Sequence, residues 1–316
     1  MNKQTTVALV EEYLALRRGL GYALHIEGAE LLRFARYADQ KGCYGVVTTD
    51  LALEWAKLPQ QADPLYWARR LDVVRRFAKY RRLFDPETEV PAKGLLGPSY
   101  RRPQPYIYSH DDVRRLMQQA SLLGPAGGLR PKTYQTLFGL LATTGLRISE
   151  ALRLKRTDVD KQRNLLTVVG TKFKKTRLVP IHRSTAEALE RYSATRDSYH
   201  RNPRSENFFL TERGTSLKYL KVLMTFLTLR HQLGWETTGK PFPTIHGLRH
   251  SFAVRCLIGW YREGRDVDRK IAALSTYLGH SKVTDTYWYL TATPELLSLS
   301  TERFERFVRG GCGGDQ

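Results

Sequence analysis

The chain has 316 residues, of which 41% are hydrophobic and 26% are charged, and this length and composition favour about two globular domains over a fibrous or low-complexity protein. No apolar run approaches the roughly 20 residues of a membrane-spanning helix, and acidic residues near the N-terminus exclude the apolar core of a secretion signal. The net charge of +20 and the pI near 10.0 favour a polyanionic partner, because Lys and Arg side chains that neutralise phosphates release condensed counterions.

Residues 1–90 are predicted to form a small helical domain, because apolar residues recur at helical spacing in four stretches. The fourth helix is expected from about Pro64 to Phe84, with aromatic and aliphatic residues on one face. Its other face is basic, with one acid, Asp72, and carries Arg69, Arg70, Arg75, Arg76, Lys79, Arg81 and Arg82. A solvated cationic face would explain such a helix, but this density of arginine favours contact with DNA phosphates.

A stretch rich in Pro and Gly, residues 91–107, is predicted to link this domain to a second one, residues 108–316. Two runs of β-branched residues, 165–169 and 177–181, predict a β-hairpin in the second domain. Helices are expected from His110 and at 133–144, 148–154, 185–199, 216–233, 246–261, 266–278, 282–290 and 294–308. The expected fold class is therefore mainly α, with a small antiparallel β-sheet in the second domain.

The second domain carries basic, proton-transferring and phenolic groups in five short motifs. In chain order these are Thr144-Gly145-Leu146-Arg147-Ile148-Ser149-Glu150, Lys172 in a basic turn, His246-x-x-Arg249, Leu278-Gly279-His280, and the pair Tyr287 and Tyr289. A tyrosine that attacks a phosphodiester needs its anion stabilised, guanidinium groups bind the extra charge on phosphorus, and the leaving oxygen needs a proton donor. The set indicates cleavage of DNA through a phosphotyrosine, which keeps the bond energy for rejoining.

In this order the motifs resemble those of the tyrosine recombinases, the phage integrase family, from about Tyr108 to Tyr289. The resemblance implies that Tyr289 is the nucleophile and that Lys172 protonates the leaving oxygen. It also implies that Arg147, Arg249 and His280 donate hydrogen bonds to the transition state. In the same way it implies that His246 assists proton transfer and that Glu150 orients the site. By layout, the basic helical domain resembles the core-binding domain of a compact Xer-like or transposon-borne member.

Two of these assignments have rivals close by. Lys174 and Lys175 lie in the same basic turn as Lys172, and counting back from the strand that follows selects Lys172. The other two lysines are expected to contact DNA. Tyr287 has the chemistry of a nucleophile, but the family spacing from the histidine selects Tyr289. Residues two apart lie about 200° apart around a helix, so only one of the two can face the phosphate.

A metal site is the main alternative for the histidines. A zinc site built from His246, His250 and His280 lacks Cys or acidic partners in register, and we interpret His250 as structural. The three cysteines also lack metal-ligand spacing and indicate reduced thiols in a cytoplasmic protein; they are Cys43, Cys256 and Cys312. We therefore expect no metal.

The resemblance implies a site-specific DNA recombinase without a cofactor. It implies double-stranded DNA with a specific recombination site, a homotetramer on paired sites and a Holliday-junction intermediate, and it leaves an accessory or partner recombinase open. A cytoplasmic, nucleoid-associated protein is expected.

Two alternative functions remain. The first is a type IB topoisomerase-like enzyme, which relaxes DNA without a specific site, and the second is a non-catalytic DNA-binding regulator of the same fold. The helix expected at 294–308 could either pack in the core of its own domain or dock into a neighbouring protomer.

Overall fold

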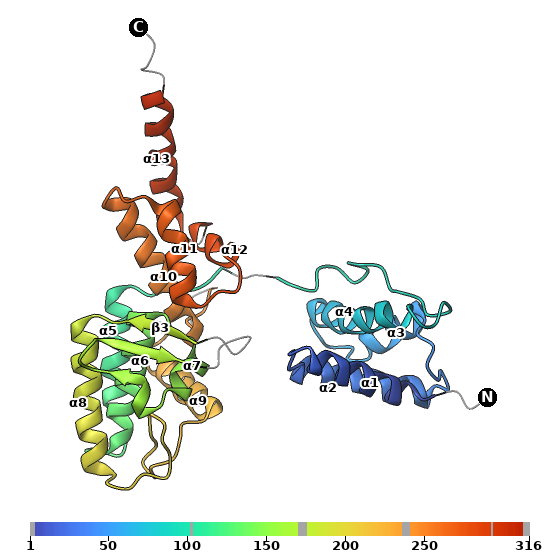
Figure 1. Ribbon diagram of the computed structural model, residues 1–316, viewed down its shortest axis with the longest axis horizontal. Helices are drawn as coiled ribbons and strands as arrows, with labels where there is room; N and C mark the ends of the chain where they lie inside the picture. Colours follow the sequence, from blue (N-terminus) through green and yellow to red (C-terminus); the bar gives the residue numbers. More distant parts are fainter. Residues whose placement is uncertain (1–3, 102–103, 170–175, 236–240, 292, 312–316) are drawn as a thin grey trace. The chain divides into compact units, whose positions relative to one another are not determined.

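The computed structural model describes residues 4–101, 104–169, 176–235, 241–291 and 293–311. The chain divides into two compact units, Met1–Pro103 and Gln104–Gln316, and the division falls inside the stretch that the sequence predicts to be a linker. Figure 1 shows the helices and strands of each unit, and each unit has its own hydrophobic core. Within the described residues, no helix combines the length and the apolar character that crossing a membrane requires.

The described residues of the first unit form the helices α1 (Thr6–Gly19), α2 (His25–Gln40), α3 (Thr49–Lys57) and α4 (Pro64–Arg81). Local sequence sets where helices begin: the side chain of Thr48 caps α3, and Asp63 caps α4 directly before a proline. The helices pack around Phe34, Trp55 and Phe77, each of which is buried. The ring of Phe34 meets that of Trp55 edge-on at 5.4 Å between centroids, so this small unit has a packed aromatic core.

The segment that follows α4 folds back onto the first unit. Val90 and Leu96 pack against its core, and the Nε atom of Arg75 donates to the carbonyl of Pro91 over 3.0 Å. The polar backbone of this proline-rich stretch is thus tied to α4 through a side chain.

The described residues of the second unit form mostly helices, with a short strand layer. The helices are α5 (His110–Ser121), α6 (Leu129–Thr144), α7 (Ile148–Arg153), α8 (Arg183–Tyr199), α9 (Tyr219–Gln232), α10 (Ile245–Arg262), α11 (Val267–Leu278), α12 (Thr284–Tyr287) and α13 (Pro294–Gly311), with 3₁₀ turns at Arg156–Asp158 and at Trp288–Thr291 (η3). The strands are β1 (Val159–Asp160), β2 (Leu165–Val168) and β3 (Arg177–Pro180).

The three strands form one antiparallel sheet in the order β1-β2-β3. Leu166 pairs with Val179 in the middle of the β2–β3 ladder, and Val168 pairs with Arg177 at its end. The predicted hairpin and the predicted fold class, mainly α with a small antiparallel sheet, are confirmed. The sequence analysis assigned strands to the residues of β2 and β3 but not to those of β1.

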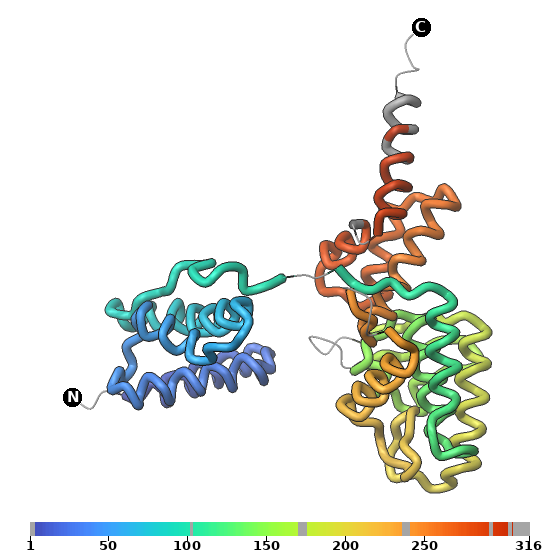
Figure 2. Tube along the Cα trace, turned by 180° about the vertical axis from the view of Figure 1, so that it is seen from behind, coloured from blue at the N-terminus to red at the C-terminus, as the bar shows by residue number. Residues whose placement is uncertain are grey.

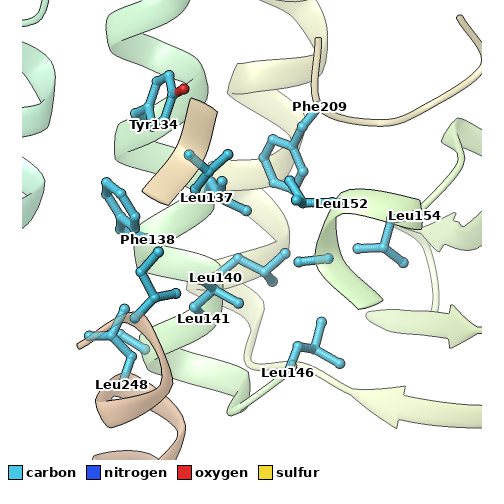
Figure 3. Packing of buried hydrophobic residues seen from close by; sticks show 14 of the residues in the cluster. Tyr134, Leu137, Phe138, Leu140, Leu141, Leu146, Leu152, Leu154, Phe209 and Leu248 are labelled. Carbon is cyan, nitrogen blue, oxygen red and sulfur yellow. The ribbon is translucent and has the colours of Figure 1, made fainter. Parts of the chain in front are cut away.

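Helix α6 lies at the centre of the second unit, as its sequence requires. Ten of its 16 residues are buried, and the exposed Lys132 and Thr143 mark the one stripe that faces outward. Figure 3 shows Leu137, Leu140 and Leu141 of α6 between Leu248 of α10 on one side and Leu152 of α7 on the other. The helix ends at Gly145, which has a left-handed φ of 61°. This buried helix therefore holds the start of the Gly145–Glu150 motif in a fixed place.

A second cluster joins α10, α11, η3 and α13, which lie together in Figure 2. The sequence predicted one continuous helix at 282–290, but the structure has the short α12 followed by the 3₁₀ turn η3. The tighter turn brings Trp288 and Tyr289 against the ring of His250. Local helix propensity does not encode this packing, which depends on α10.

Candidate active site

Arg147 is held at the start of α7, where its backbone and its side chain both contact Glu150. The backbone N–H of Arg147 donates to Glu150 Oε2 over 2.9 Å, and Nη1 donates to Oε1 over 2.9 Å. Nη2 of Arg147 donates to the carbonyl of Gly279 over 3.0 Å. About a third of the arginine side chain (34%) stays exposed, so it is fixed and still open to a ligand.

Glu150 is buried and ionised between two arginines. Arg177, the first residue of β3, donates from Nη1 to Oε1 over 3.1 Å and from Nη2 to Oε2 over 2.9 Å. Burial alone would raise the pKa of Glu150, but the hydrogen bonds from Arg177 and from the Arg147 backbone outweigh it and bring the pKa down to about 2. The sequence analysis missed Arg177. A signal was present, because strand alternation places Arg177 on the same face as the buried Val179.

Arg249 lies fully inside the second unit and is held by two backbone carbonyls. Nη1 donates to Gly145 over 2.7 Å, and Nη2 donates to Leu278 over 2.8 Å. Burial and the nearby charge of Arg147 lower the pKa of Arg249 to about 10, while the neighbouring Tyr289 and Glu150 act in the opposite direction. Arg249 therefore stays charged at neutral pH and lies beside the Tyr289 hydroxyl.

His246 lies one helical turn before Arg249, as the His-x-x-Arg spacing predicts. The residue as a whole is exposed, but the protein atoms around its ring desolvate the imidazole. This desolvation, with repulsion from Arg249 and then Arg147, lowers the pKa of His246 to about 4. The imidazole is therefore neutral at physiological pH. His250 packs against it edge-on, with 4.5 Å between ring centroids.

The Leu278–His280 turn joins the two arginines. Helix α11 ends at Gly279 with a left-handed φ of 69°, and the carbonyls of Leu278 and Gly279 then point at guanidinium groups. The backbone N–H of His280 donates to Ser275 over 3.0 Å, and its Nδ1 atom lies 2.7 Å from the Thr286 hydroxyl. Thus one short turn sets the positions of Arg147, Arg249 and His280.

Tyr289 is the buried member of the tyrosine pair. Its side chain is 2% exposed, whereas that of Tyr287 is 45% exposed. The Tyr289 ring stacks on His280 at 6.0 Å between centroids and meets His250 at 5.4 Å. The structure therefore brings Tyr289 together with Arg147, Glu150, His246, Arg249 and His280, and leaves Tyr287 outside this cluster.

The lysine assignments cannot be placed in the same way. Lys172, Lys174 and Lys175 lie outside the described residues. In sequence they fall between Val168, the last residue of β2, and Arg177, the first residue of β3. In the parts of the chain that are described, no group of three or more His, Cys, Asp or Glu side chains could hold a metal ion.

The family model described as the phage integrase family matches residues 107–295, which contain every residue of this cluster. The chain belongs to the phage integrase family. The integrase/recombinase y4rB of Sinorhizobium fredii is 42% identical to it over 94% of this chain and 96% of that protein. The tyrosine recombinase XerA of Thermococcus onnurineus is 31% identical over 75% of each chain. With the motif order above, these relatives make this phage integrase family member a tyrosine recombinase that acts in site-specific recombination.

Solved structures with low sequence identity share the fold of this tyrosine recombinase. The Tn1549 transposon integrase in complex with transposon right end DNA has a TM-score of 0.66 at 17% identity, covering 96% of this chain and all (100%) of that one. The XerH site-specific recombinase bound to a palindromic difH substrate has a TM-score of 0.65 at 16% identity, covering 88% and 78%. The likeness therefore extends through both units of the chain.

The basic residues of α4 in the first unit of this recombinase have three different environments. Four are exposed: Arg69, Arg76, Lys79 and Arg82. Two are half-buried: Arg75, which donates to Pro91, and Arg81, which lies 3.8 Å from Asp85. Arg70 is buried and lies over the Trp55 ring at 3.8 Å.

The sequence placed Arg70 on the exposed basic face, and that placement is wrong. Arg70 shares the spacing of Val74 and Phe77, which line the core stripe of α4. Its Nη2 atom donates to the carbonyl of Trp55 over 2.8 Å, and Nη1 lies 3.6 Å from Glu30. These contacts offset the burial of the charge.

Proposed function

We propose that Tyr289 cleaves one DNA strand at a specific site. Its oxygen attacks a phosphodiester, forms a 3′-phosphotyrosine bond and releases a 5′-hydroxyl, and the reverse reaction with another 5′-hydroxyl rejoins the strand. The observation that carries the proposal is the convergence of Arg147, Arg249 and His280 on one backbone turn beside the buried Tyr289. This is the arrangement that a charged pentacoordinate phosphorus requires.

The other groups have complementary roles in this proposal. The guanidinium groups of Arg147 and Arg249 stabilise the negative charge that develops on the phosphate oxygens. His246, neutral because its pKa is about 4, assists the transfer of the Tyr289 proton. Lys172 donates a proton to the leaving 5′ oxygen. Each step conserves the phosphoester bond, so the reaction needs no energy source.

The proposed substrate is double-stranded DNA that carries a recombination site. Two related proteins of the same fold have been solved with DNA, one on a transposon end and one on a difH site. The excess of basic residues suits such a substrate. We propose that four protomers assemble on two paired sites, exchange strands through a Holliday junction and act in the cytoplasm at the nucleoid.

Covalent trapping tests this function. Duplexes that cover the DNA on both sides of the gene, each nicked close to the candidate cleavage positions, are incubated with the wild-type chain, Tyr289→Phe and Tyr287→Phe. The nick lets the short 5′-hydroxyl fragment diffuse away, so the cleaved strand cannot be rejoined. The protein then stays covalently attached to this DNA strand on a denaturing gel. We expect adducts with the wild type and Tyr287→Phe and none with Tyr289→Phe. Adducts that persist in Tyr289→Phe, or DNA binding without any adduct in the wild type, would overturn the proposal.

A further inference from the structure

Arg177 connects three parts of the active site that are distant in sequence. Its two Nη atoms donate to the two oxygens of Glu150, and its Nε atom donates to the carbonyl of Tyr277 over 2.8 Å. Only 11% of its side chain is exposed. All the polar atoms of this guanidinium group therefore bond to protein groups on α7 and at the end of α11.

The backbone at Gly279 fits closely around the same guanidinium group. A Cβ atom at Gly279 would lie 2.7 Å from Nη1 of Arg177 and 2.8 Å from its Cζ. Gly279 also has the left-handed φ of 69° that favours glycine. The close approach and the Tyr277 hydrogen bond fix Arg177 against the turn whose carbonyls hold Arg147 and Arg249.

Arg177 also determines how strongly Glu150 engages Arg147. Each oxygen of Glu150 accepts one hydrogen bond from Arg147 and one from Arg177. The carboxylate charge is thus shared between the two arginines, and Arg147 keeps part of its side chain exposed. Without Arg177, burial would raise the pKa of Glu150, and the carboxylate would either take up a proton or interact with Arg147 alone.

We propose that Arg177 is a positioning residue for strand cleavage: by holding Glu150 and the Tyr277–Gly279 turn together, it fixes Arg147 and His280 at the distance that the scissile phosphate requires. This inference rests on the proposed function of the site. The hydrogen bonds of Arg177 go to Glu150 and to the carbonyl of Tyr277, so it acts on the phosphate-binding side of the reaction and not on proton donation to the 5′ oxygen. Its loss should slow cleavage and leave DNA binding nearly intact.

The test compares Arg177→Met and Arg177→Lys with a matched control, Arg196→Met. Arg196 lies on α8, outside the site, and is buried somewhat more deeply than Arg177, with 3% of its side chain exposed. It donates to Asp197 and to the carbonyl of Phe208. Affinity for the site DNA is measured by gel shift, and adduct formation is measured in single turnovers at saturating DNA. We expect Arg177→Met to slow adduct formation by about 10- to 100-fold, less than the about 10²–10³ of a direct donor. Arg177→Lys should restore part of the rate, and Arg196→Met should cleave as the wild type does.

Two further measurements separate positioning from a loss of folding. In Arg177→Met the acidic limb of the cleavage rate should move to higher pH, because Glu150 loses the partner that keeps it ionised. The second uses a duplex with sulfur in place of the leaving 5′ oxygen, since a thiolate leaves without a proton donor. This substrate should restore the cleavage rate of the Lys172→Ala variant and should not restore that of the Arg177→Met variant.

Three results would overturn the positioning role. They are a wild-type rate in Arg177→Met, an equal loss in Arg196→Met, and restoration of Arg177→Met by the sulfur substrate. These results differ from a failure of the proposed function itself, which would show as the absence of a Tyr289 adduct in the wild-type chain.

Discussion

The ring of His280 lies nearly parallel to that of Tyr289, with 6.0 Å between centroids and 24° between the planes. The Nδ1 atom of His280 lies 2.7 Å from the hydroxyl of Thr286, which is itself fully buried. Thr286 belongs to α12, the short helix that immediately precedes Tyr289. The orientation of the histidine is therefore set by the same segment that carries the proposed nucleophile.

Removing the Thr286 hydroxyl should loosen His280 without removing it. Thr286→Val keeps the side-chain volume but loses the hydrogen bond to Nδ1, so we expect slower adduct formation by about 3- to 10-fold, the equivalent of one ordinary hydrogen bond of about 1 kcal/mol. His280→Ala should cost about 10²–10³-fold. Thr284→Val is the control, because Thr284 lies exposed on the same helix. If Thr286→Val and Thr284→Val slowed adduct formation equally, the hydrogen bond between Thr286 and His280 would not explain the effect. Single-turnover trapping measures all three rates.

Gly279 and Gly264 provide a matched pair of glycines. Both follow a helix with similar positive φ values, 69° and 65°, but a Cβ atom at Gly264 would meet nothing within 4 Å. Alanine at either position should destabilise the fold by about 1–2 kcal/mol, because of the left-handed backbone. Only Gly279→Ala should also slow cleavage, since its Cβ would displace Arg177. Thermal unfolding and adduct formation are measured on both variants, and similar cleavage rates would contradict the argument.

The sequence predicted most of the cluster because its members lie in short motifs with fixed spacing. Arg147 follows a helix-ending glycine, His246 and Arg249 share a helix face, and Tyr289 was chosen over Tyr287 by spacing. Tyr289 is buried in the structure and Tyr287 is exposed, while the choice of the nucleophile stays a prediction. These local patterns predict which side chains face inward, because the spacing of residues along a helix determines which of them share a face.

The contacts between motifs could not be predicted in the same way. Arg177 and Glu150 are 27 residues apart, and no periodic pattern relates a strand residue to a helix residue at that separation. Arg70 illustrates the converse: its charge suggested an exposed face, but its position on α4 and its packing on Trp55 place it in the core. The 3₁₀ turn that carries Tyr289 likewise depends on packing against His250.

Stability should depend on pH through Glu150. Its pKa in the folded chain, about 2, lies below the usual 4.5, so ionised Glu150 stabilises the fold above about pH 4.5, and this contribution is lost as the pH falls toward 2. The shift corresponds to at most about 3 kcal/mol. The difference in unfolding free energy between the wild type and Glu150→Gln should therefore shrink between neutral pH and about pH 3.

Urea unfolding at a series of pH values measures this difference. Glu187→Gln is the control, because Glu187 forms an exposed pair with Arg183, and such pairs contribute little, about 0–1 kcal/mol. A Glu150→Gln difference that does not change with pH would show that Glu150 is not held ionised by its arginine partners.

The exposed basic residues at the C-terminal end of α4, including its C-cap Arg82, should control DNA affinity through charge alone. Lys79 and Arg82 are both exposed on the first unit, and we expect each to contact a DNA phosphate. Lys79→Gln and Arg82→Gln should each weaken binding on all sequences alike and reduce the slope of log affinity against log salt by about 1. Arg33→Gln is the control, because Arg33 is an exposed arginine of α2 already paired with Glu30. Gel shifts at several salt concentrations measure the slopes. An unchanged slope in both α4 variants would place the DNA on another face of the unit.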